Sequence, residues 1–140
     1  MKVALKLEEG MKISGIDSHG HITKFDTVEE FGGNDSAPTP MEVMLEAMAA
    51  CSVMDVVAIL RKKRKTIDSL NIEVEGTKAE KHPKVYTNVE ITYILKSPDT
   101  ELADLERAIQ LSQTTYCGAS AMFQRSGCVV TTNAVLNPNE

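Results

Sequence analysis

The feature that most constrains this chain's fold is a long run of helix-forming, mostly apolar residues from Pro40 to Leu60. Thr39 precedes it as a favourable N-cap, and Glu42 falls three residues later, which is the spacing of a capping box. Few polar residues interrupt the run, so we expect a helix that is buried on most sides. The basic residues 61–65 suit the negative end of its dipole. The expected inner positions are Met44, Ala47, Met48, Cys51, Met54, Val57 (or Ala58) and Ile59.

The composition is that of an ordinary globular protein. At 140 residues, with 42% apolar and 25% charged residues, the chain predicts a single domain over residues 1–140 that needs no disulfides to fold. The net charge of −5 and the pI near 5.2 argue against a nucleic-acid partner, which usually requires net positive charge. The basic run 61–65 is therefore read as a solvated helix end.

Targeting, membrane and metal signals are weak. Residues 1–9 interleave charged and apolar residues, and we expect no export signal, no stretch of about 18 apolar residues and no membrane partner. A cytoplasmic location is therefore expected. His19 and His21 lie in a predicted turn, where a solvated turn is favoured over a metal site. No cofactor or metal is expected.

The pattern on both sides of the long helix predicts an α+β chain. Residues 1–31 alternate over three short segments, which indicates three antiparallel strands, and residues 32–40 read as a loop. Residues 71–76 and 85–95 predict a hairpin. A second helix begins near Ser97, with an inner stripe expected at Leu102, Leu105, Ile109 and Ser112. A break at residues 113–116, a short helix from Cys117 and a closing strand at 127–136 complete the pattern.

The three cysteines are the candidate chemical groups. Cys51 lies in the middle of the long helix, where a small core residue and a reactive thiol are about equally plausible. Cys117 opens a short helix, and a helix N-terminus favours the thiolate. Cys128 lies in an apolar strand and is interpreted as inert core. Asp55, one turn past Cys51, either polarises that thiol or is an exposed break in the helix. Spacing alone does not show whether Cys51 and Cys117 meet.

Two motifs resemble those of the OsmC/Ohr family, which includes osmotically inducible and organic hydroperoxide resistance proteins. The segment 37–57, with Cys51 after two alanines, resembles the first cysteine motif, and the segment 115–120 around Cys117 resembles the second. The order of the predicted elements is similar to that of the family along the whole chain. The resemblance implies an OsmC-like fold, with two antiparallel sheets around central helices, in an intertwined homodimer with active sites at the interface.

The resemblance also implies a thiol-dependent peroxidase. Cys51 would be the peroxidatic thiolate that attacks an organic hydroperoxide, and Cys117 would resolve the sulfenate into a disulfide. An external dithiol would restore both thiols. Glu42 is a candidate catalytic residue, although its spacing first predicts a capping role. The implied partners are a second copy of the chain, an organic hydroperoxide and the dithiol.

Two positions depart from the family's peroxidase pattern. The family's glutamate lies ten residues before the first cysteine, where this chain has Met41, and Glu42 points about 100° away around the helix. No arginine precedes Arg61, so Lys24, His19 or His21 would have to stabilise the thiolate. A buried thiol without a cation is expected to have a raised pKa. The alternative is a non-catalytic protein of this fold that binds an apolar ligand or senses redox state at its dimer interface.

Overall fold

The computed structural model describes residues 1–139. They fall into two compact units, one from Met1 to Met44 and one from Leu45 onward, and each is described by itself. The long helix α1 (Pro40–Lys62) begins in the first unit, and most of its turns belong to the second.

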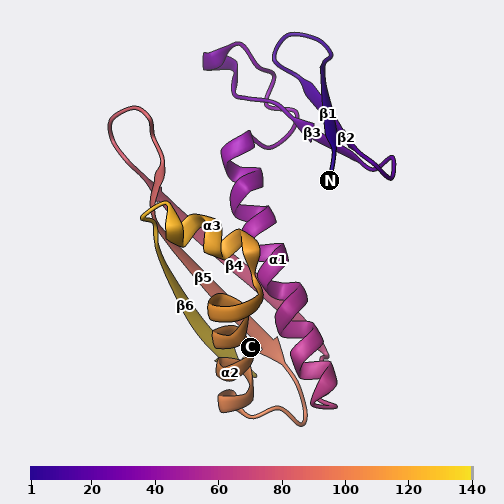
Figure 1. Cartoon of the computed structure of the whole chain (residues 1–140), viewed down its shortest axis with the longest axis vertical. Helices are drawn as coiled ribbons and strands as arrows, with labels where there is room; N and C mark the ends of the chain where they lie inside the picture. Colours follow the sequence, from indigo (N-terminus) through magenta and orange to yellow (C-terminus); the bar gives the residue numbers. More distant parts are fainter. Residues whose placement is uncertain (140) are drawn as a thin grey trace. The chain divides into compact units, whose positions relative to one another are not determined.

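The first unit is a three-stranded antiparallel sheet followed by a tight loop, as predicted. Its elements are β1 (Val3–Leu7), β2 (Ile13–Asp17), β3 (Ile22–Phe25) and the short 3-10 helix η1 (Glu29–Phe31) (Figure 1). The buried carboxylate of Asp26 organises the loop that follows. It accepts backbone N–H groups from Thr27, Asn34 and Ser36 and the hydroxyl of Ser36, and these donors lower the pKa of Asp26 to about 2.

The capping box at the start of α1 is present as predicted. The backbone N–H and the hydroxyl of Thr39 donate to Glu42 Oε2 at 2.8 and 2.7 Å, and the N–H of Glu42 points back to Thr39 Oγ1 at 3.4 Å. Each residue therefore satisfies a donor that the helix itself leaves unpaired. The helix ends at Lys62, within the basic run.

The burial of α1 differs from the prediction. Its buried residues form one narrow stripe, and Met44 and Met54 are 48% and 72% exposed. The prediction that α1 is buried on most sides is therefore wrong for the single chain. The expectation that no segment is apolar enough to span a bilayer is wrong as well, because α1 is long and apolar enough by length and composition, with 28% of its most apolar window buried. The core helix of a globular protein meets the same criteria of length and apolar composition. The narrow buried stripe of α1 consists of Met48, Ala49, Ser52, Val56 and Leu60.

Besides most of α1, the second unit contains a three-stranded sheet and three further helical segments. Its further elements are β4 (Ser69–Lys78), β5 (Tyr86–Lys96), α2 (Leu102–Leu111), the π-helical turn η2 (Ser112–Tyr116), α3 (Gly118–Arg125) and β6 (Val129–Leu136) (Figure 1). The hairpin β4–β5 is antiparallel as predicted, but β6 pairs with β5 in parallel. The α+β class is confirmed, whereas the second sheet is mixed, because the helical crossover returns the chain in the direction of β5.

One face of β5 supplies much of the core in the second unit. Val89, Ile91, Tyr93 and Leu95 alternate along the strand and are at most 1% exposed. From α2, the core receives Leu105, Ala108 and Ile109, while Leu102, which was predicted to face inward, is 44% exposed. The expected burial of Ser112 is confirmed.

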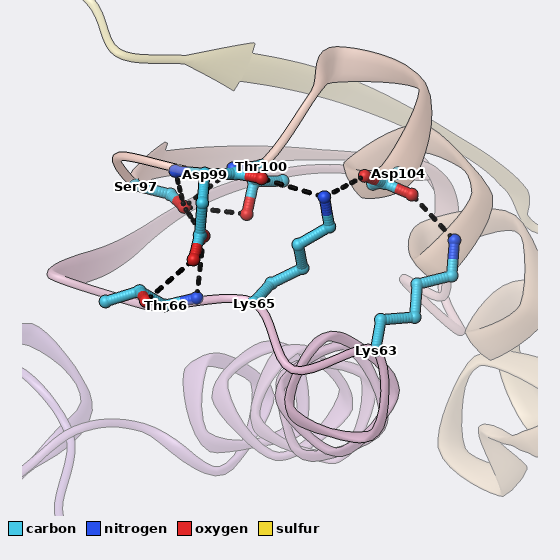
Figure 2. Close-up of polar contacts among 7 residues, drawn as sticks. All are labelled: Lys63, Lys65, Thr66, Ser97, Asp99, Thr100 and Asp104. Carbon is cyan, nitrogen blue, oxygen red and sulfur yellow. Dashed lines mark hydrogen bonds and ion pairs between the residues drawn. The ribbon is translucent and has the colours of Figure 1, made fainter.

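The segment that follows α1 is bonded to the first turn of α2 and to the loop before it by charged and polar side chains. Lys63 and Lys65 contact the two carboxylate oxygens of Asp104 at 2.8 and 2.9 Å (Figure 2). Asp99 accepts the backbone N–H and the hydroxyl of Thr66. Two of the five basic residues after Leu60 are thus used for structure. Hydrogen bonds and charge attraction from the two lysines lower the pKa of Asp104 to about 2.

This lowered pKa predicts an acid-sensitive contribution to stability. The contribution of Asp104 is fully present above the ordinary carboxyl pKa near 3.8 and is lost as the pH falls towards about 2. We expect Asp104→Asn to lower the free energy of unfolding at neutral pH and to make its decline between about pH 4 and pH 2 less steep than in the wild type. Urea unfolding across that range measures both effects, and equal slopes for the two proteins would contradict the assignment.

Candidate thiol site

Cys117 is the N-cap of α3, as its position before the short helix predicted. Its sulfur accepts the backbone N–H of Ser120 at 3.3 Å, and its side chain is buried, with 3% exposure. Its own N–H donates to the carbonyl oxygen of Ser112 at 2.8 Å, which closes the π-helical turn η2. The predicted break at residues 113–116 is this turn, and it delivers Cys117 to the start of α3.

Cys51 lies next to Cys117, a meeting that the sequence spacing could not establish. Its side chain is partly buried on α1, and the backbone N–H of Ala119 and the thiol of Cys117 are near enough to shift the pKa of its sulfur. The thiol of Cys117 itself donates to the carbonyl oxygen of Met48, on α1, at 4.0 Å. Both thiols are free. The first turn of α3 therefore presents two consecutive peptide N–H groups, one to each sulfur atom.

The pKa of Cys51 is set by opposing influences. The N–H of Ala119 lowers it, whereas burial, the contact with Cys117 and the charge of Asp55 raise it, and the net shift is upward. No cationic side chain of the described residues is among these main influences. The raised pKa agrees with the expectation for a thiol that has no positive partner. Asp55 affects the thiol electrostatically and is not a bare exposed break in the helix.

A buried polar network beside the thiols was not predicted from the sequence. The hydroxyls of Ser52, Tyr93 and Ser112 are fully buried and joined in series, with Ser52 Oγ 2.5 Å from Tyr93 OH and 2.9 Å from Ser112 Oγ. Ser112 Oγ also donates to Asp55 Oδ2 at 2.9 Å. The sign of this network in the sequence was Ser52, a polar residue in an otherwise apolar helix stripe. Its partner Tyr93 on β5 lies 41 residues further along the chain, so the sequence pattern did not predict their contact.

The other candidate residues lie in the first unit or in the core. Glu42 is engaged with Thr39 in the capping box, and its catalytic role stays a prediction. Lys24, His19 and His21 also belong to the first unit. There, His21 Nδ1 lies 2.8 Å from Asp17 Oδ2. The stabilisation of the Cys51 thiolate by one of these three residues stays a prediction. Cys128 is 5% exposed, and burial raises its pKa, which fits an inert core residue.

Two hollows border the site. One, of about 580 Å³, begins one turn past Cys51 and has Ala58, Ile59 and Leu111 among its lining residues, together with Asp55 and Lys62. The other, of about 470 Å³, includes Cys117 and Arg125 in its lining. The first has apolar walls that suit an organic molecule.

Removing the charge of Asp55 is expected to make Cys51 more reactive. Asp55→Asn keeps an oxygen that can accept from Ser112 but removes a charge that raises the pKa of Cys51. We expect iodoacetamide to alkylate Cys51 about two- to fivefold faster near neutral pH, because the thiolate fraction rises. Peptide mapping assigns the modified residue. Glu46→Gln on the same helix is the matched control, and an equal increase there would show that net charge alone is responsible.

The amino-acid sequence of this chain is similar to those of known proteins. The family described as OsmC-like protein matches residues 32–133 of this chain. Protein YhfA of Escherichia coli K12 is 30% identical over 126 residues, which cover 90% of this chain and 91% of YhfA.

Solved structures share the fold. A hypothetical protein from Aquifex aeolicus VF5 is 30% identical, with a TM-score of 0.84 over 99% of this chain and 97% of that one. A Legionella pneumophila protein described as an organic hydroperoxide resistance protein OsmC is 13% identical, with a TM-score of 0.68 over 96% of this chain and 97% of that one. The second likeness concerns the fold alone.

Proposed function

Because the chain belongs to the OsmC-like protein family, we propose that it is a thiol-dependent peroxidase that reduces organic hydroperoxides through Cys51 and Cys117. The observation that carries the proposal is that the two thiols are neighbours at the first turn of α3. Two neighbouring thiols are able to exchange two electrons with a substrate and store the oxidation as a disulfide.

The proposed cycle balances with the groups at the site. The Cys51 thiolate attacks the terminal oxygen of the hydroperoxide, the O–O bond breaks, and the alcohol leaves after taking up a proton. Cys51 is then a sulfenic acid. The Cys117 thiolate attacks its sulfur, which forms the disulfide and releases the oxygen as water. An external dithiol supplies two electrons and two protons and becomes a cyclic disulfide, which fits the reducing cytoplasm expected for this chain.

Local geometry supports this division of roles. Cys51 is the less buried thiol, and the apolar hollow begins one turn further along α1, at Asp55, so Cys51 suits first contact with the hydroperoxide. The N–H of Ala119 stabilises negative charge on its sulfur. Cys117 is only 3% exposed, although it lines the second hollow, and it neighbours Cys51, which suits the second step. The raised pKa of Cys51 implies a slow first step at neutral pH that accelerates as the pH rises.

Thiol counting with about one equivalent of an organic hydroperoxide tests the cycle. We expect the wild type to lose two of its three thiols with no oxygen added to its intact mass, because Cys51 and Cys117 close a disulfide. Cys51→Ser should abolish turnover, and Cys117→Ser should retain one oxygen on Cys51 as a sulfenic acid.

Cys128→Ser is the matched control, because that buried thiol is placed outside the site and its loss should leave turnover in place. Three thiols that survive hydroperoxide treatment, or undiminished turnover in Cys51→Ser, would contradict the peroxidase proposal.

A second candidate function is ligand binding or redox sensing without turnover. The raised pKa of Cys51 and the apolar hollow beside it favour this alternative. It predicts a sluggish thiol, no turnover with any dithiol, and a melting temperature that rises when an apolar ligand is added. The same hydroperoxide assay separates the two functions.

We also propose that the chain functions as a homodimer. The apolar helix α1 presents Met44 and Met54 to solvent, and only 28% of its most apolar window is buried by its own chain. An apolar helix that is bare on several sides requires a partner surface.

Light scattering coupled to gel filtration should give twice the chain mass of 15.3 kDa. Met54→Glu should shift the protein towards the monomer, because it places a charge on this bare face. Glu46→Gln is the matched control on the same helix. A wild type that remains monomeric at micromolar concentration would refute the dimer.

A further inference from the structure

The buried hydroxyls beside the thiols form a directional series, named here the hydroxyl chain: Tyr93, Ser52 and Ser112, ending at Asp55. The carboxylate of Asp55 only accepts hydrogen bonds, so Ser112 donates its single hydroxyl hydrogen to it at 2.9 Å. The 2.9 Å contact between Ser112 and Ser52 is then donated by Ser52. By the same reasoning Tyr93 donates to Ser52, and every hydroxyl hydrogen points towards the carboxylate.

The hydroxyl chain joins the backbone segments that carry the two thiols. Ser52 directly follows Cys51 in α1. Ser112 accepts the N–H of Cys117 through its carbonyl oxygen at 2.8 Å. The link between the side chains of Ser52 and Ser112 therefore connects one residue adjacent to the first thiol with another bonded to the second.

The turn that holds Cys117 requires such support. The bond from Cys117 N–H to the Ser112 carbonyl spans five residues, which is the rare π-helical pattern and is frequent at functional sites. Gln113, the next residue of this turn, donates from Nε2 to Ser52 Oγ at 3.1 Å and to Tyr93 OH at 3.3 Å. Two successive residues of the turn, Ser112 and Gln113, are thus bonded to the buried hydroxyl of Ser52, and Gln113 is also bonded to that of Tyr93.

We propose that the hydroxyl chain is a positioning device that holds Cys117 within reach of Cys51. The proposal deepens, and rests on, the proposed thiol cycle. The three buried hydroxyl residues, Tyr93, Ser52 and Ser112, line neither hollow and are given no contact with the hydroperoxide. They act through the backbone, by fixing the π-helical turn against α1. A buried, charge-terminated network suits this task, because each bond polarises the next and the loss of one member leaves its partners unsatisfied.

The test is a thiol–disulfide equilibrium that does not use hydroperoxide. Oxidised dithiothreitol accepts two electrons and two protons from Cys51 and Cys117, which form the disulfide as reduced dithiothreitol is released. Peptide mapping quantifies the disulfide in the full chain over a series of oxidised-to-reduced ratios. The equilibrium constant reports how well the fold pairs the thiols, independently of the first peroxidatic step.

Two substitutions interrupt the hydroxyl chain at different points. We expect Ser112→Ala to lower the equilibrium constant about tenfold, because it removes the bond to the carboxylate. We expect Tyr93→Phe to lower it about threefold, because its neutral bonds to Ser52 and from Gln113 are lost while the ring stays. Ser97→Ala is the matched control. Ser97 is also buried and hydrogen-bonded, but to Asp99 and Thr100, and the constant should stay within about twofold of the wild type.

Each outcome decides between the two proposals. Constants equal to that of the wild type in folded Ser112→Ala and Tyr93→Phe would overturn the positioning role, as would a wild type that forms no disulfide. An equal loss in Ser97→Ala would overturn it as well, because general destabilisation would then explain the effect. A wild type that forms the disulfide but leaves hydroperoxide unreduced would overturn the peroxidase proposal and leave the positioning role intact.

Discussion

The site depends on two consecutive peptide N–H groups in the first turn of α3, which bond to the sulfur atoms of Cys51 and Cys117. Helix N-termini leave such donors unpaired, and a sulfur atom that carries negative charge satisfies them. The same short helix therefore offers one N–H group to each sulfur atom and helps to fix where both thiols lie. The π-helical turn before it and the stripe of α1 behind it serve to bring this helix start to Cys51.

The helix α1 is apolar on most of its surface, but a single chain buries only part of that surface. One narrow stripe packs in the second unit and includes Ser52, while Met44 and Met54 remain exposed. A sheet and two short helices cover one side of a helix and leave the remainder bare. The apolar composition of the whole helix is explained if a second copy covers what the chain itself does not, as proposed above.

Local sequence patterns were sufficient to predict the helices and strands, but insufficient to predict contacts between residues far apart in the chain. The capping box of Thr39 and Glu42, the antiparallel strands and the N-cap role of Cys117 all depend on neighbouring residues, and all were predicted. The parallel pairing of β6 with β5 and the Ser52–Tyr93 contact depend on residues about 40 positions apart. No periodicity encodes such contacts. The narrow burial of α1 was missed because an apolar run does not show how much of its surface one chain covers.

The pKa of Cys51 is set by groups among which no cationic side chain of the described residues is a main influence. The N–H of Ala119 lowers the pKa of Cys51, but burial, Cys117 and Asp55 together outweigh it. Asp55 also terminates the hydroxyl chain, and the two roles oppose each other. In the proposed cycle, the carboxylate would weaken the nucleophile while it orders the turn that carries the resolving thiol. On that proposal, the site would favour closure of the disulfide over attack on the hydroperoxide.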